Sequence, residues 1–196
     1  MAIDVNYESH VNETDAVIRD RTIPAEGINP LDYSDILKFS NCHNITVTNC
    51  TISGGKEDCI DAVRGNQYNI TDTTLSPVYN GITLKGSIDT IEIDNVGFTK
   101  HGTDCDIEFG QFDNYWYIGR KPTRNITIKD TNAYDGKPLK VKLWDAQEPV
   151  VFNSNVKVIK IPKIIWFPYF VFRAIQVRGI TNIFKPVKDD TFIPST

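Results

Sequence analysis

The chain lacks two features that would assign it at once to a membrane or an exported class of protein. No run of its sequence approaches the ~20 apolar residues that cross a bilayer, so we expect no transmembrane helix. The first ten residues, MAIDVNYESH, have neither the cationic nor the apolar region of a secretory signal peptide. The sequence therefore predicts that the protein is not exported through a signal peptide.

An excess of basic charge is absent as well. The chain carries 21 Lys and Arg against 25 Asp and Glu, a formal net charge of −4 at pH 7, and the two signs are interspersed. Nucleic-acid-binding proteins usually present a basic face. We therefore expect no nucleic acid among the partners of this protein.

A repeat dominates the middle of the sequence. Three consecutive stretches, Asn41–Gly65, Asn66–Gly86 and Ser87–Gly110, each contain an alternating segment, a polar turn and a second alternating segment. A step of 21 residues aligns Val63 with Leu84. Alternation with a period of two indicates strands, and we find no convincing amphipathic helix. A fixed period of this length predicts a stack of short strands, in which each repeat buries the apolar side of the next.

Copies of the two segments extend the repeat in both directions. They are Val17–Ile23 with Asp35–Asn41, Asn125–Tyr134 with Leu139–Asp145, and Val150–Ile159 with Arg173–Gly179. We predict an all-β fold, a right-handed parallel β-helix (solenoid) of about six coils. A sandwich of β-hairpins is disfavoured because the turns are uneven and rarely of the two-residue type. The predicted β-helix domain is 16–180, between an N-terminal segment 1–15 and a C-terminal tail 181–196, and it carries an insertion 111–124 and an apolar segment 160–173.

The chain contains four cysteines, Cys42, Cys50, Cys59 and Cys105, and none stands in a CxxC pair or at a spacing typical of zinc sites. In the predicted stack, Cys59 and Cys105 lie two coils apart, too far for a disulfide. We predict buried free thiols in a reducing setting.

Asparagine begins the first strand of several coils, at Asn44, Asn69 and Asn125, each time within an Asn-x-Thr triplet. Such triplets are acceptors for glycosylation in secreted proteins. We favour a structural explanation, in which the Asn side chain satisfies the backbone of the turn.

The repeated phrase N-I-T-[VI]-x-[ND]-x-x-[IL], followed by a turn and a short strand that ends in Gly, resembles the pectate-lyase-like superfamily of right-handed β-helices. The resemblance covers roughly residues 16 to 180, and the small size is most similar to phage-encoded members, which places the protein in a virion or a host cytoplasm. It implies a carbohydrate-engaging protein, either a polysaccharide lyase-like enzyme acting on an acidic glycan or a non-catalytic virion structural or receptor-binding protein. Fold resemblance alone does not choose between them.

Hydrolase motifs of that superfamily are incomplete in this sequence. Glu57–Val63 is similar to the D-D-C-I-A-I phrase of polygalacturonases, and the G-H-G motif is reduced to His101-Gly102. Glycoside hydrolysis needs two carboxyl groups at a defined separation. The missing motifs disfavour hydrolysis and leave β-elimination as the chemistry to consider.

Elimination needs a base and a means of neutralising the uronate carboxylate. The candidate catalytic residues are Arg64, Lys85 and His101. Arg64 and Lys85 are 21 residues apart, so we expect them to stack on neighbouring coils and point outward. The alternatives are an ordinary surface pair of cations and a solvated turn histidine.

Acidic residues near the ends of the second segments form the candidate metal site, which could hold Ca²⁺ because hard cations prefer oxygen ligands. These residues are Asp58, Asp61, Asp104, Asp106 and Glu108. In the alternative interpretation they form cross-strand ion pairs, since Asp106 and Glu108 fall one coil below Lys140 and Lys142.

The insertion Gln111–Arg124 is rich in aromatic and cationic residues. Its candidate substrate-binding residues are Tyr115, Trp116, Tyr117 and Arg120, because aromatic rings stack on sugars and cations hold acidic groups. The alternative is a loop that covers a bare face of the stack. Trp144 we interpret as a packing residue.

The stretch Ile164–Phe172 is apolar throughout and flanked by cations. It could cap the open end of the stack, form an oligomer interface, with a trimer as the expected assembly, or dip into a membrane surface. A membrane is the least favoured of the three. In the first two cases the stretch is buried, and Pro168 makes a regular central strand through it unfavourable.

Overall fold

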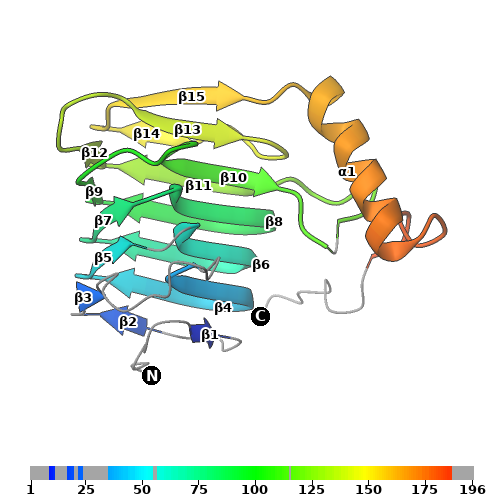
Figure 1. The fold of residues 1–196 in the computed structure, drawn as a ribbon, viewed down its shortest axis with the longest axis horizontal. Helices are drawn as coiled ribbons and strands as arrows, with labels where there is room; N and C mark the ends of the chain where they lie inside the picture. Colours follow the sequence, from blue (N-terminus) through cyan, green and yellow to red (C-terminus); the bar gives the residue numbers. More distant parts are fainter. Residues whose placement is uncertain are drawn as a thin grey trace.

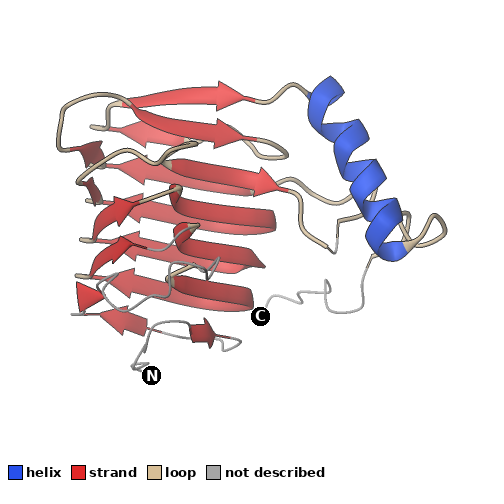
Figure 2. Cartoon of the chain, viewed as in Figure 1, coloured by secondary structure: helices blue, strands red, loops and turns tan. Residues whose placement is uncertain are grey.

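The computed structural model describes residues 35–54, 57–114 and 116–186, together with the backbone of three short strands before residue 35 (Figures 1 and 2). The described chain is mostly β-structure with one α-helix. The larger sheet has the order β1 (Ser9–Val11), β4 (Leu37–Thr48), β6 (Asp58–Thr71), β8 (Asn80–Asp94), β10 (Ile107–Gln111), β13 (Leu139–Leu143), β15 (Val156–Lys160), with β2 (Val17–Arg19), β11 (Arg124–Lys129) and β14 (Val150–Phe152) paired beside this path. The smaller sheet has the order β12 (Asn132–Ala133), β9 (Gly97–Phe98), β7 (Thr74–Pro77), β5 (Thr51–Gly54), β3 (Thr22–Ile23).

Every strand pair within the described part of Asn41–Gly110 is parallel, as the repeat predicts. From β3 to β10, consecutive strands alternate between the two sheets, so each repeat in this part contributes one strand to the larger sheet and one to the smaller. The two upstream segments lie where the repeat predicts them: Val17 pairs with Thr46 of β4, and Leu37 pairs with Ile60 of β6.

The long strands change direction at residues with a left-handed backbone. One half of β8 pairs with β10 and the other half with β11, and the halves meet near Gly86 (φ 75°). Asn tolerates this conformation better than most residues. Asn44 and Asn125 adopt it, with φ of 55° and 54°, whereas Asn69 does not. The repeated asparagines therefore have a structural role at two of the three positions.

Alternate residues of the strands point inward and stack from one repeat to the next. In one column each residue pairs with the next, in the order Leu37, Ile60, Ile82, Ile107, Val141 and Val158. Their side chains belong to one continuous hydrophobic core, in which Val158 is partly buried. The four cysteines are buried thiols that form no disulfide, as predicted.

The predicted 21-residue alignment is wrong by one residue at a critical place. Ala62 pairs with Leu84 and Val63 pairs with Lys85, and a bulge follows between Val63 and Gly65. A bulge places an additional residue on one strand and shifts every later pair. The additional residue lies on β8, where Gly86 and Ser87 together face Arg64 (φ 62°). Lys85 is already paired with Val63, so Arg64 does not stack on it.

The helix α1 (Lys163–Arg178) contradicts two expectations, the absence of a helix and a final strand at Arg173–Gly179. Trp166, Phe170 and Ala174 recur every four residues and are buried, which is the spacing of one helix face. A continuous apolar run shows no period, so the sequence pattern could not distinguish helix from strand. Burial of this face outweighs the interior Pro168, which removes one helical hydrogen bond.

The helix runs alongside the stacked strands rather than across the last of them, β15 (Figures 1 and 2). It packs on a second hydrophobic cluster that includes Trp116 from the insertion and Ile183. The expected burial of Ile164–Phe172 holds for one side only, since Phe170 is buried and Phe172 is 59% exposed. Among the described residues, no helix is long and apolar enough to cross a membrane.

Candidate functional site

A cavity of about 650 Å³ lies between α1 and the outer side of the larger sheet, and we call it the groove. Its size is within the range of ligand-binding pockets. The strands contribute Lys38, Ser40, Val63 and Lys85; the insertion and the residue after β13 contribute Gln111, Phe112, Asp113, Asn114 and Trp144; the helix contributes Ile165, Tyr169 and Arg173.

The parallel register builds the floor of the groove. Ser40 pairs with Val63, Val63 with Lys85, and Lys85 with Gln111, so these four residues form one column. Neighbours in this column are about 4.8 Å apart, the spacing of paired strands. The residue before each of the first three, such as Leu84 before Lys85, is buried in the core. Alternation along the strand therefore points the column outward, toward α1.

Aromatic contacts hold α1 at its distance from the sheet. Phe170 lies against Trp144 with nearly parallel rings, at 6.1 Å between centroids, and against Phe112 edge-on at 5.5 Å. Phe112 also contacts Tyr169 at 6.4 Å. Aromatic pairs in such geometries contribute about 0.5–1.5 kcal/mol beyond burial. The wall of the groove is thus a packed aromatic structure with Tyr169 half-exposed beside it.

The groove presents cations. Lys38, Lys85 and Arg173 line it, and among the described lining residues Asp113 is the one carboxylate. Asp113 is buried and receives two hydrogen bonds from Nη1 of Arg120, at 2.7 and 2.9 Å. Its charge is therefore compensated by Arg120, and the described lining contains more cations than carboxylates.

A row of buried acidic residues lies next to the floor. Lys38 pairs with Asp61, Asp61 with Thr83, and Thr83 with Glu108. Asp61 contacts Lys38 and, at 3.0 Å from Oδ2, the Nζ of Lys85. These contacts fix both ammonium groups at the edge of the groove.

Burial changes the pKa values of acidic residues in this row and of Asp58, three residues before Asp61. Burial raises the pKa of Asp58 to about 7, although Lys85 and a hydrogen bond from the Thr83 side chain act in the opposite direction. Burial also raises the pKa of Glu108, opposed by the hydrogen bond from Nε1 of Trp144 and by Lys142. One oxygen each of Asp58, Asp61 and Glu108 is buried without a hydrogen-bond partner. These carboxyl groups are therefore held at an energetic cost, and for Asp58 the protonated form is favoured below neutral pH.

The five candidate metal ligands do not form one site. Carboxylate oxygens of Asp58 and Asp61 come within 4.8 Å of each other and of Asp35, and Asp104 and Glu108 form a second group with Cys105. Asp106 belongs to neither group.

Neither group of acidic residues suits Ca²⁺. In the first group, the ammonium groups of Lys38 and Lys85 occupy Asp61, so they compete with an ion for the same oxygens. In the second, Lys142 contacts Asp104, and burial raises the pKa of Cys105, which keeps the thiol protonated. Ca²⁺ takes six to eight oxygen ligands, and the lysines and the thiol reduce what each group can offer.

The two candidate bases lie in different cavities. Lys85 lies in the groove, whereas Arg64 is only 6% exposed and lines a separate pocket of about 330 Å³ together with Tyr117, Arg120 and Arg124. This second pocket, which we call the basic pocket, also contains His43 and Lys121 among its lining residues. The 21-residue step had aligned these two cations, but the strands pair here with an offset of 22 residues, which places Lys85 opposite Val63 instead of Arg64.

The insertion provides structure as well as lining. Trp116 is buried against Phe167 and Phe170, so it anchors α1 and is not accessible to a ligand. Tyr117 and Arg120 line the basic pocket, and Tyr115 lies outside the described residues. Among the described rings of the insertion, Phe112 is the one that reaches the groove, although it was not among the candidate substrate-binding residues.

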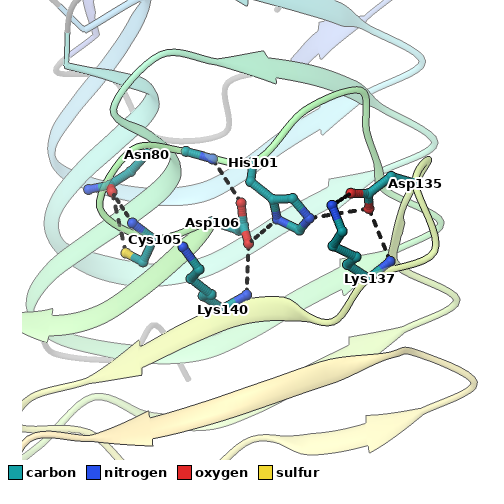
Figure 3. Close-up of polar contacts among 8 residues, drawn as sticks. Asn80, His101, Cys105, Asp106, Asp135, Lys137 and Lys140 are labelled. Atoms are coloured by element: carbon teal, nitrogen blue, oxygen red, sulfur yellow. Dashed lines mark hydrogen bonds and ion pairs between the residues drawn. The ribbon is translucent and has the colours of Figure 1, made fainter.

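His101 lies away from both cavities, in the turn before β10 (Figure 3). Its Nδ1 is 2.9 Å from the buried carboxylate of Asp106 and its Nε2 is 3.2 Å from Asp135. The hydrogen bond to Asp106 raises the pKa of His101. Asp106 also accepts hydrogen bonds from the backbone N–H groups of Gly102 and Lys140. This arrangement identifies His101 as part of a network that fixes the turn.

No protein-family model, curated protein or solved structure matches the chain. The function must therefore be inferred from the geometry of the groove and its surroundings.

Several residues of the groove escaped prediction from the sequence for identifiable reasons. Lys38 could have been predicted from the sequence, because Asp35–Asn41 is recognisable as a copy of the segment that contains Asp61, and Lys38 pairs with that residue. Tyr169 and Arg173 could not have been predicted, because their place in the groove beside Lys85 depends on a helix that the sequence pattern did not indicate.

Proposed function

We propose that the protein binds an acidic polysaccharide in the groove between α1 and the larger sheet. The observation that carries this proposal is the lining itself, in which three cations, Lys38, Lys85 and Arg173, stand beside three aromatic residues. Aromatic faces stack on the apolar faces of sugar rings, and cations pair with uronate carboxylates or sulfates. Few other ligands combine these two requirements along an extended chain.

We further propose that the stack is a right-handed parallel β-helix of about six coils, of the pectate-lyase-like type. Parallel pairing throughout the larger sheet supports this architecture, as does the alternation of consecutive strands between two sheets. In such a scaffold, one outer side presents columns of residues to an elongated ligand. The column from Ser40 to Gln111 is of this kind.

A lyase activity at the same site is the catalytic version of this proposal. Lys85 is the candidate base of the groove, and its amine would need to be neutral before it could act. The amine would take the proton beside the uronate carboxylate, the electron pair would form a C=C bond, and the C–O bond to the next sugar would break. The departing oxygen would take a proton from solvent. The unsaturated product absorbs ultraviolet light, which gives a direct assay.

Titration of the protein with pectate, alginate and glycosaminoglycans, followed by calorimetry, tests the binding proposal. We expect Lys85→Ala and Arg173→Ala each to weaken binding of the preferred glycan about tenfold, equivalent to ~1.4 kcal/mol. Lys100→Ala is the matched control, because Lys100 is exposed and outside the groove lining. Absence of binding across the panel, or equal losses in all three variants, would refute the proposal.

A second function is favoured by one separate observation. The exposed apolar residues of α1, such as Ile164 at 84% exposure, are typical of a surface that joins a larger assembly. A non-catalytic virion structural or receptor-binding protein, including a trimer formed through Ile164–Phe172, would use such a surface. Binding without formation of unsaturated product would favour this receptor-type function over a lyase.

A further inference from the structure

The helix α1 is apolar on every side. Its inner face, formed by Trp166, Phe170 and Ala174, is buried against the second hydrophobic cluster. Yet Ile164 is 84% exposed and Phe172 is 59% exposed. A helix that is hydrophobic all round is normally covered on all sides. The structure therefore leaves an apolar surface that calls for a partner.

Helical geometry collects the exposed residues into one stripe. Ile164, Pro168 and Phe172 recur every four residues, and all three are exposed. They are two positions out of phase with Trp166, Phe170 and Ala174, so they lie on the opposite face. We call this stripe the outer face of α1. Two exposed apolar residues follow the helix, Ile180 at 66% and Phe184 at 63% exposure.

The charge around α1 is mainly positive. The stretch Pro149–Lys188 contains seven of the 21 basic residues of the chain and none of its 25 acidic residues. Five of the seven lie on α1 or near its ends: Lys160, Lys163, Arg173, Arg178 and Lys185. Lys160 is paired with Glu148, and Arg178 donates hydrogen bonds to the backbone oxygens of Trp116 and Lys185. In a protein with a net charge of −4, the exposed apolar stripe thus lies on a positively charged element.

This charge decides between possible partners. Two copies that met through α1 would bring like charges together, which costs several kcal/mol at an interface. An anionic lipid bilayer offers an apolar interior for the stripe and negative headgroups for the cations. Helices that lie in a membrane surface combine these same features, with aromatic and aliphatic residues on one side and lysines and arginines beside them.

We propose that the outer face of α1 docks on the surface of an anionic lipid bilayer. The 16-residue helix, about 24 Å long, would lie flat in the headgroup region while the stacked strands remain outside. Apart from Arg173, which also lines the groove, this interaction uses residues outside the proposed glycan site. The sequence alone disfavoured a membrane, because it showed no helix on which the apolar residues could be sorted into faces.

Cosedimentation of the full chain with lipid vesicles tests this proposal. We expect binding to vesicles of phosphatidylcholine with roughly a quarter phosphatidylglycerol, and at least about tenfold weaker binding to phosphatidylcholine alone. Added salt should weaken the binding, because it screens the cations. The double variant Ile164→Ser/Phe172→Ser should reduce the vesicle partition coefficient at least about tenfold, since less apolar area is available for transfer.

Two control variants and one folding measurement distinguish membrane binding by α1 from general effects of removing an apolar residue, from glycan binding in the groove and from unfolding. Tyr134→Ser removes an apolar residue that is 67% exposed but lies outside α1, and it should bind vesicles as the unaltered protein does. Lys85→Ala should lose glycan affinity and keep vesicle binding, so the failure of one proposal does not imply failure of the other. Retained circular dichroism in the double variant establishes that it folds.

Three results would overturn the proposal. The first is no binding to the anionic vesicles at low salt. The second is equal binding by the double variant and the unaltered protein, which would place the lipid contact elsewhere. The third is an oligomer, seen by light scattering without lipid, that the double variant abolishes; a second copy would then cover the outer face.

Discussion

At the scale of single residues, the buried acidic row beside the groove is the most consequential feature. Asp61 is fully buried on the outer side of a strand, where alternation alone would predict a solvated residue. Its two lysine partners explain how the charge is tolerated, because a buried carboxylate requires compensation. The same contacts hold Lys38 and Lys85 in the groove. The row thus links stability to the proposed binding surface.

Asp58→Asn should stabilise the protein at pH 8. The folded pKa of Asp58, about 7, lies above its ordinary value of 3.8, so the folded state binds this proton more tightly than the unfolded chain. The stability that the proton contributes is complete below pH ~4 and is lost as the pH rises through about 7. The Asn variant avoids this loss.

The expected gain from Asp58→Asn is roughly 1–3 kcal/mol at pH 8 and much less at pH 4.5, measured by urea unfolding. Glu92→Gln, at an exposed position, is the control and should change stability little at either pH. A gain that is equal at both pH values would contradict the assigned cause.

At the scale of elements, α1 and the insertion form one unit. The helix reaches the strands through Phe170, whose ring contacts Trp116, Trp144 and Phe112. The insertion is fixed in turn by the pair of Asp113 and Arg120. That pair passes directly over Gly86, where an added Cβ would meet Asp113 Oδ2 at 1.9 Å. The groove exists because this unit stands at a set distance from the sheet.

Phe170→Ala should therefore destabilise α1 far more than Phe172→Ala. Phe170 is fully buried, and truncation of a buried Phe typically costs about 3–5 kcal/mol. Phe172 is 59% exposed, and its replacement should cost less than about 1 kcal/mol. Urea unfolding, with the helical signal in circular dichroism as a second measurement, checks this contrast. Equal effects of the two substitutions would show that α1 is not anchored through its inner face.

At the scale of the whole molecule, parallel strands in register place side chains from distant parts of the sequence into columns. Lys38 and Lys142 belong to the same outward row, joined through Asp61, Thr83 and Glu108. The row has a lysine at each end and the two carboxylates between them. The molecule therefore neutralises its own acidic groups with lysines rather than requiring an added cation.

Removal of calcium should leave the protein unchanged. We expect the midpoint of thermal unfolding and the glycan affinity to be the same in the presence of a chelator and of millimolar Ca²⁺. The reason is that lysines already contact Asp61 and Asp104, one residue from each of the two candidate metal-binding groups. Thermal unfolding and calorimetry under the two conditions provide the measurement. A calcium-dependent rise in the midpoint of several degrees would show that an ion displaces these lysines.

The sequence by itself determined the strands and their parallel order. Alternation is a local property, so it shows that Ile60 and Ile82 belong to strands with one buried side, although the 21-residue step misses their pairing by one residue. The buried thiols followed from the same pattern. These features depend only on residues close in sequence or one repeat apart.

Tertiary structure decided the site. The offset between β6 and β8 is 22 residues up to the pair of Val63 and Lys85, and a bulge makes it 23 from the pair of Gly65 and Ile88 onward. This register depends on how the two strands pair rather than on either strand alone. It places Lys85 beside Val63 in the groove, whereas Arg64 lines the basic pocket. The apolar run became a helix because its four-residue spacing matches a surface formed by Trp116 and Trp144. Packing between distant segments selected that conformation, and a pattern within one segment carries no information about it.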